Sequence, residues 1–214
     1  MTSGDNESTR SGYDRLAGAY AQRFLDELDG KPFDRRLLDH FAADVSDRGD
    51  VCDVGCGPGH VARYLRDRGI NVFGLDLSPA MVATAREHHP EIRFVEGDMA
   101  ASKLPDASLA GVVAFYAIVN SAPEKLAGIF EEFARVLKPG GLLLLAFHIG
   151  DERRHVDELL EVPVSLDFFF HDTHAVVEEL RAAGFTIEIA VERAPYAPDV
   201  EHQSRRAYIF ARRA

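Results

Sequence analysis

Hydrophobic positions after residue 50 follow two alternating patterns, which predict a series of strands and helices. Short continuous apolar runs are typical of strands buried on both faces, whereas apolar residues at helical spacing are typical of amphipathic helices. The runs predict strands at 50–54, 70–77, 92–95, 109–119, 142–147, 185–191 and 206–211. The helical spacing predicts helices at 60–68, 79–88, 124–137 and 172–183. This alternation favours an α/β fold with a mostly parallel sheet that helices cover on both faces.

Two stretches do not follow the alternation. Residues 11–45 are expected to form one or two helices before the first strand, and residues 148–171 an irregular segment before the last helix. Because ligands in open α/β sheets bind beyond the carboxyl ends of the strands, both stretches are interpreted as lids, the second over the substrate. The polar residues 1–10 are expected to form a disordered tail, which leaves 11–214 as a single domain.

Composition and charge limit the partners and the cellular location that are expected for this chain. The chain has 214 residues, which suits one domain, and its 24 Lys and Arg against 35 Asp and Glu give a net charge of −11. An acidic protein repels phosphates, so a nucleic-acid partner is unfavourable. The apolar runs are too short for a membrane span, and the N-terminus lacks the features of a signal peptide. Cys52 and Cys56 are too few for a disulfide scaffold, so a cytoplasmic location is expected. The protein is expected to be a monomer or homodimer without a membrane partner.

A glycine-rich turn between the first strand and the following helix carries the strongest chemical signal. Gly55, Gly57 and Gly59 are spaced as GxGxG, and glycines there allow a tight turn and the close approach of a ligand. A dinucleotide-binding GxGxxG turn would need glycine where this chain has His60. Asp53 precedes the turn, and it can either contact the ligand or hold the amides of the loop.

Carboxylates end the next two strands. Asp76 lies 21 residues after Gly55, where a carboxylate can accept both hydroxyls of a ribose. Asp98 follows Gly97 at the end of the third strand and can accept a hydrogen bond from an adenine amino group, with Met99 packed on the ring. The spacing therefore predicts an adenosine-containing ligand.

These motifs resemble those of class I S-adenosylmethionine-dependent methyltransferases. The resemblance rests on Val51–Gly59, Gly74–Ser78, Glu96–Met99 and Leu137–Gly141, in the family's order and spacing. It implies a Rossmann-like, doubly wound, seven-stranded sheet with an antiparallel last strand. It also implies S-adenosyl-L-methionine as cofactor, S-adenosyl-L-homocysteine as product, and a small-molecule acceptor. The cofactor-binding residues expected from the motifs are Tyr13, Tyr20, Asp53, Gly55, Gly57, Gly59, Asp76, Leu77, Met81, Gly97, Asp98, Met99 and Phe115.

Candidates for the acceptor side follow the fourth and fifth strands. Tyr116 and Asn120 are expected to face the methyl group, and His148, at the ligand edge, is the first candidate for a general base, with Tyr116 as the second catalytic candidate. His155, His171 and His174 lie in or beside the substrate lid. No metal site is predicted, because His171, Asp172 and His174 lack a clear fourth ligand.

Several alternatives stay open at this stage. An NAD-type oxidoreductase would also use Asp76, and a catalytically silent binding module would keep the same motifs. Phe168–Phe170 either line a pocket, plug the end of the core or pair as an extra strand. The acceptor, the atom that is methylated and the oligomeric state do not follow from the sequence.

Overall fold

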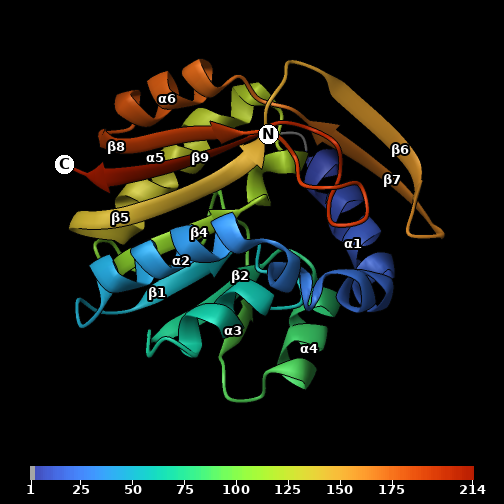
Figure 1. Ribbon diagram of the computed structural model, residues 1–214, viewed down its shortest axis with the longest axis horizontal. Helices are drawn as coiled ribbons and strands as arrows, with labels where there is room; N and C mark the ends of the chain where they lie inside the picture. The colour runs from blue at the N-terminus through green and yellow to red at the C-terminus, as the bar shows by residue number, and fades with distance from the viewer. Residues whose placement is uncertain (1–2) are drawn as a thin grey trace.

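The computed structural model describes residues 3–214, and its centre is a seven-stranded sheet. Along the sheet the strands follow the order β3-β2-β1-β4-β5-β9-β8 (Figure 1). Their bounds are β1 Val51–Val54, β2 Val72–Asp76, β3 Phe94–Glu96, β4 Leu109–Phe115, β5 Leu137–His148, β8 Phe185–Arg193 and β9 Arg206–Arg213. The first five are parallel, and β9 runs antiparallel between β5 and β8. The predicted sheet with an antiparallel last strand is confirmed.

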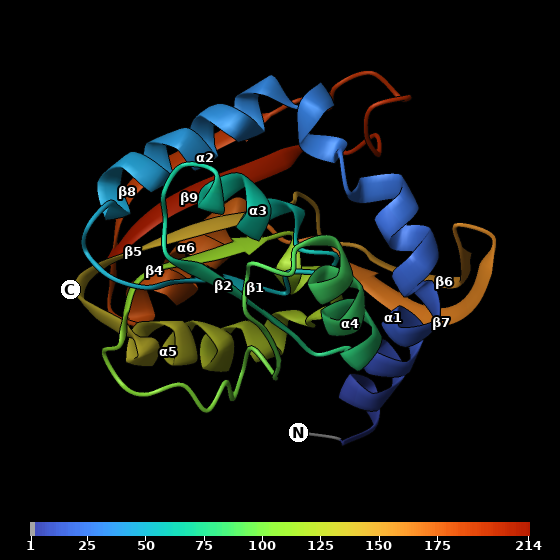
Figure 2. The same cartoon turned by 90° about the horizontal axis from the view of Figure 1, so that it is seen from below.

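Helices cover both faces of this sheet. The hydrophobic cores place α2 (Pro32–Val45), α3 (His60–Arg66) and α4 (Pro79–His88) on one face, and α5 (Leu126–Val136) and α6 (Thr173–Ala182) on the other. Figure 2 shows α2 and α5 on opposite sides. In the described part of the chain, residues 3–214, no helix combines the length and the apolar character needed to cross a membrane.

The segment 148–171 is not irregular, as the sequence suggested, but contains a β-hairpin. Strands β6 (Arg153–Leu159) and β7 (Val162–Phe169) pair antiparallel and extend beyond the sheet next to α1 (Figure 1). Leu160 and Glu161 form the turn with positive φ angles of 53° and 62°. A two-residue hairpin turn of this kind usually contains Asn or Gly, so Leu-Glu gives little sequence signal for it.

Helix α1 (Ser3–Phe24) is longer than expected, so residues 3–10 are not the disordered tail that their polarity suggested. Its early turns are held by side chains of the body: Asn6 donates a hydrogen bond to Asp98, and Arg10 forms an ion pair with Glu96. The rest of α1 buries Leu16 and Ala17 against the apolar face of the hairpin. Contacts distant in sequence therefore stabilise a segment whose own composition is polar.

Two element boundaries on the ligand side also differ from the prediction. Strand β4 ends at Phe115, because Tyr116 has a left-handed φ of 57° and turns the chain into the short helix η2 (Ala117–Asn120). Ser121 does not cap the next helix, as its spacing to Glu124 suggested. The short helix η3 (Pro123–Lys125) intervenes, and α5 begins at Leu126 without a side-chain cap. The left-handed turn places the Tyr116 side chain at the ligand edge.

Candidate active site

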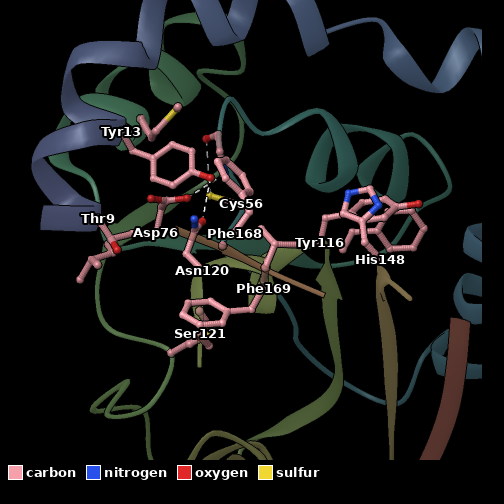
Figure 3. A pocket seen from close by; sticks show the side chains of 18 of the residues that line it. Thr9, Tyr13, Cys56, Asp76, Tyr116, Asn120, Ser121, His148, Phe168 and Phe169 are labelled. Atoms are coloured by element: carbon pink, nitrogen blue, oxygen red, sulfur yellow. Dashed lines mark hydrogen bonds between the residues drawn. The ribbon is translucent and has the colours of Figure 1, made fainter. Parts of the chain in front are cut away.

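A cavity of about 780 Å³ lies at the carboxyl ends of the central strands, beneath α1 and the hairpin (Figure 3). This volume falls in the range of roughly 300–1,000 Å³ that is usual for small-molecule sites. All of the predicted cofactor residues except Asp53 and Gly59 line it, and so do both catalytic candidates, Tyr116 and His148. The sequence motifs therefore meet in one cavity.

The glycine-rich turn forms one wall. Gly57 has a φ of 50° and lines the cavity, and a Cβ placed on it would make an ordinary contact of 3.7 Å with Cε1 of Tyr20. Gly59 serves packing instead. Its φ is 87°, and a Cβ there would lie 2.7 Å from the ring of Phe94. Only glycine fits at position 59, but the reason is the core and not the ligand.

Asp53 likewise stabilises the turn from behind the cavity. Its side chain is buried, and Oδ2 accepts a hydrogen bond of 3.0 Å from the backbone N–H of Ala62, in the first turn of α3. Burial raises the pKa of Asp53 to about 7, although nearby His60 and the Ala62 amide favour the charged form. Of the two roles considered for Asp53, the geometry supports the structural one.

Asp76 lies at the cavity wall beside the glycine-rich turn. Its carboxylate accepts hydrogen bonds from the backbone N–H groups of Gly57, at 2.8 Å, and Ser78, at 2.9 Å. Burial raises the pKa of Asp76, and the two amides counteract that shift. Each carboxylate oxygen has a further lone pair, so the group can still accept hydroxyl donors from a ligand.

Asp98 already binds an amide nitrogen of the protein. Nδ2 of Asn6 donates to Oδ2 of Asp98 at 2.7 Å, while Oδ1 accepts the backbone N–H of Ala100. Asn6 thus supplies the kind of N–H donor that an adenine amino group would supply. This match supports the hydrogen-bonding role expected for Asp98.

The two lid segments meet at Asn120. The Tyr13 hydroxyl of α1 donates to Oδ1 of Asn120 at 2.8 Å, and Nδ2 of Asn120 donates to the carbonyl of Asp167 in β7 at 2.7 Å. Figure 3 shows the Tyr13 hydroxyl directed at Asn120 beside Asp76. Tyr20 packs nearby against Phe24, with ring centroids 4.3 Å apart. One side chain after β4 therefore connects both lids.

Sequence reasoning missed a charged cluster at the cavity wall next to Tyr20. Oε1 of Glu27 lies 2.8 Å from Nε2 of His60, and its other carboxylate oxygen binds Lys31. Although burial acts in the opposite direction, His60 and Lys31 lower the pKa of Glu27 to about 2. Glu27 and Lys31 are separated by one helical turn in a polar stretch, so only the tertiary structure indicates that they face a ligand cavity.

At the end of the cavity away from Asp76, Tyr116 and His148 lie side by side, with ring centroids 5.0 Å apart (Figure 3). The Tyr116 hydroxyl is 3.1 Å from that of Tyr208, which donates to the buried Asp34. Burial and the Asp34 charge raise the pKa of Tyr116 well above its usual value. Tyr116 is therefore a neutral wall residue and a poor base.

His148 is also a weak base in this environment. Burial lowers its pKa to about 3, and the basic groups of Arg206, His202 and Lys31 contribute in the same direction. The other three histidines singled out in the sequence do not line the cavity. His155 binds Asp157 and Asp167 on the hairpin, buried His171 faces the carbonyl of Ile118, and His174 is exposed on α6. Within residues 3–214 no group of metal-ligating side chains is found.

Comparisons with known proteins agree with this site. A family model described as a methyltransferase domain matches residues 51–141. A malonyl-[acyl-carrier protein] O-methyltransferase of Serratia marcescens is 28% identical over 194 residues, which cover 85% of this chain and 73% of the relative. The corresponding Pectobacterium atrosepticum enzyme is 39% identical over 96 residues, but the match covers 45% of this chain and only 37% of that protein.

The fold agrees over the whole chain with the solved structure of the DhpI–SAH complex. The TM-score is 0.75 at 21% identity, and the match covers 100% of this chain and 99% of that one. The matched residues 51–141 contain the glycine-rich turn, Asp76 and Asp98, which line or border the cavity. The family-model match, the sequence relatives and the solved structure together support a class I S-adenosylmethionine-dependent methyltransferase.

Proposed function

We propose that this chain transfers the methyl group of S-adenosylmethionine to a small-molecule acceptor. The observation that carries the proposal is the continuity of the cavity. It joins the glycine-rich turn and the two strand-end carboxylates to an aromatic end around Tyr116 and Phe170. A cofactor and a small acceptor bound in one such cavity, under two lids, would be held next to each other. The acidic net charge of −11 supports a small acceptor over a nucleic acid.

The residues fit the cofactor part by part. Asp76 would accept the ribose hydroxyls with the lone pairs that the Gly57 and Ser78 amides leave free. Asp98 would accept from the adenine amino group in place of Asn6, next to Met99 at the cavity wall. The backbone of Gly57 lines the cavity and suits the amino-acid part, since a side chain at this position would extend into the cavity.

The cofactor supplies a sulfonium-bound methyl group, which is strongly electrophilic, so the protein mainly has to align the acceptor and exclude water. Tyr13 and Asn120 close the cavity from one side, and Phe168 and Phe169 of the hairpin line it from another (Figure 3). The free, buried thiols of Cys52 and Cys56 also support the proposal that the enzyme works in the reducing cytoplasm.

Calorimetry with three ligands tests the proposal. We expect S-adenosylmethionine and S-adenosylhomocysteine to bind, and NAD not to bind, because His60 stands where a dinucleotide turn has glycine. Failure of S-adenosylhomocysteine to bind would contradict the proposal. Cofactor binding without turnover on any acceptor of a broad panel would instead identify a silent binding module.

A further inference from the structure

The end of the cavity away from Asp76 is built from aromatic rings. His148 lies at its centre, with ring centroids 5.0 Å from Tyr116, 5.6 Å from Phe170 and 5.9 Å from His202. Flat rings packed in this way present apolar walls with a few polar edges. This end therefore suits an acceptor with an aromatic or aliphatic body.

Positive charges lie over the same rings. Nζ of Lys31 is 5.7 Å and Cζ of Arg206 is 5.9 Å from the Tyr116 centroid, and Cζ of Arg154 is 5.5 Å from that of Phe170. An aromatic pocket often binds a cation through the faces of its rings. Lys31 and Arg206 are ion-paired with Glu27 and Glu201, and Arg154 is ion-paired with Glu152 at the half-exposed wall. Among residues 3–214, an ammonium acceptor would therefore meet three cations and no free carboxylate at this end, whereas an anion can bind to the exposed guanidinium of Arg154.

Glu201, an acidic side chain at this end of the cavity, already binds groups of the protein. The Glu201 carboxylate binds the guanidinium of Arg193 at 2.5 and 3.0 Å and accepts the backbone N–H of Tyr196. Glu201 raises the pKa of His148, but Arg206, His202 and Lys31 lower it. The titratable and charged groups that face His148 are Arg206, His202, Lys31, Glu201 and Tyr116. Burial is the largest cause of the lowered pKa of His148, and Arg206, His202 and Lys31 lower it further, so the imidazole is neutral.

A neutral His148 can act as a hydrogen-bond donor. Nδ1 lies 2.7 Å from Oγ of Ser204. The Ser204 hydroxyl can donate to Nδ1, and in that tautomer the single ring hydrogen lies on Nε2. Within residues 3–214 no hydrogen-bond partner is found for Nε2. His148 can thus present an N–H group to a bound anion, with the half-exposed guanidinium of Arg154 at the same wall.

We propose, on the basis of the methyltransferase function above, that the acceptor is a carboxylic acid with an apolar or aromatic body, bound as its carboxylate, and that a carboxylate oxygen is methylated. The oxygen lone pair forms the new O–CH₃ bond while the CH₃–S bond breaks and its electron pair goes to sulfur. The products are a methyl ester and S-adenosylhomocysteine, and no proton is released. This reaction needs no general base, and neither His148 nor Tyr116 is suited to be one.

A panel of matched acceptors tests the proposal. Benzoate, phenylacetate, cinnamate and octanoate are incubated with the enzyme and S-adenosylmethionine that carries a deuterated methyl group, beside the amides, alcohols and amines of the same carbon skeletons. We expect methyl esters from carboxylates and no product from the matched neutral or cationic compounds. Absence of any ester, or equal or greater turnover of amides, alcohols or amines, overturns the proposal. Calorimetry with S-adenosylhomocysteine in the same preparation separates this failure from failure of the methyltransferase assignment.

Variants at the cavity wall test the binding mode on the acid with the highest turnover. Arg154→Gln is expected to raise KM about three- to tenfold with a smaller change in kcat, since it removes one half-exposed cation. Arg205→Gln removes the same charge from an exposed ion pair with Glu192 and is expected to leave KM unchanged. His148→Phe should raise KM about tenfold or more, and His148→Gln, which restores an N–H donor, should recover part of that loss. Unchanged KM in Arg154→Gln and His148→Phe overturns the assigned anion site.

The pH profile separates a carboxylate from an acceptor that must lose a proton. A carboxylic acid with a pKa of about 4 is fully ionised above pH 6. We therefore expect kcat/KM to be flat between pH 6 and pH 9. A tenfold rise per pH unit in this range would indicate deprotonation of an alcohol or phenol and would overturn the proposal.

Discussion

At the scale of single residues, the cavity wall combines groups that contact the ligand space with groups that only support it. Asp76 and Gly57 belong to the first kind, whereas Asp53 and Gly59 lie behind the wall. Asp53, Gly57 and Gly59 lie in or directly before the glycine-rich turn, and Asp76 ends strand β2. Substitutions can distinguish these roles because ligand affinity and stability respond separately.

Asp76→Asn is expected to weaken S-adenosylhomocysteine binding about ten- to a hundredfold. Loss of a charge-assisted hydrogen bond to a ribose hydroxyl costs about 1.5–3 kcal/mol. The amide keeps an oxygen for one of the two backbone N–H groups, from Gly57 and Ser78, and loses the hydrogen bond to the other. Thermal unfolding therefore accompanies the titration, and the fold should persist with a lower melting temperature. Calorimetry measures the affinity, and Asp199→Asn, an exposed site, is the control. Equal affinity in the Asp76 variant and the wild type would contradict the ribose assignment.

Gly57→Val is expected to abolish cofactor binding while the protein stays folded. The new side chain would extend into the cavity beside Tyr20, and a φ of 50° also makes valine strained there, at about 1–2 kcal/mol. Thermal unfolding and a binding titration measure the two effects. Gly18→Ala on α1, where the added methyl group meets no atom within 4 Å, is the control. A Gly57 variant that binds normally would show that position 57 does not approach the ligand.

At the scale of elements, helix α1 and the β6–β7 hairpin act as one cover. They share an apolar interface around Leu16, Val164 and Leu166, and both reach Asn120 through hydrogen bonds. Asp14 of α1 also accepts hydrogen bonds from the Ser78 hydroxyl and the Ala80 amide at the start of α4. The cover is therefore tied to the ends of the strands that form the cavity floor.

We expect S-adenosylhomocysteine to slow amide hydrogen exchange in residues 8–24 and 153–169 together, because ligand binding stabilises the closed lids. Asn120→Ala should increase exchange in both segments and weaken ligand binding, since it removes both hydrogen bonds. Tyr13→Phe removes one of them and should affect mainly α1. Exchange that remains unchanged in both segments on adding ligand would contradict the role of these elements as lids.

At the scale of the whole molecule, buried charge makes stability depend on pH. The pKa of Asp53 is about 7 in the folded protein and about 4 in an unfolded chain, so the folded state binds the proton more tightly. Stability from this group is present below about pH 4 and is lost as the pH rises toward 7. Glu27, with a folded pKa of about 2, acts in the opposite sense. Its contribution to the free energy of unfolding is present above about pH 4 and is lost as the pH falls toward 2.

Asp53→Asn should therefore raise the free energy of unfolding relative to the wild type more at pH 8 than at pH 4. The difference between the two pH values should exceed about 1 kcal/mol. The variant keeps an oxygen for the Ala62 amide and removes the charge. Urea unfolding at both pH values measures the difference, with Asp199→Asn as the control. A variant whose free energy of unfolding follows that of the wild type at both pH values would contradict the assigned burial effect.

The sequence by itself determined the sheet, its parallel order, and the glycine-rich turn with Asp76 and Asp98. Periodicity and motif spacing are local properties, and the carboxyl ends of neighbouring parallel strands necessarily meet at one edge. The sequence did not determine the helical residues 3–10 or the β6–β7 hairpin, because the contacts that stabilise them come from segments more than 80 residues away.

Only the tertiary structure decided which polar residues line the cavity. It placed Asp53 and Gly59 behind the wall, and it placed Glu27 and Lys31 at the wall. It also buried His148 next to Arg206 and Lys31, and burial first, with these cations second, lowers the pKa of the expected base. Burial and the field of distant charges set the chemistry of an ionisable group, and neither is encoded in the residues next to it along the chain.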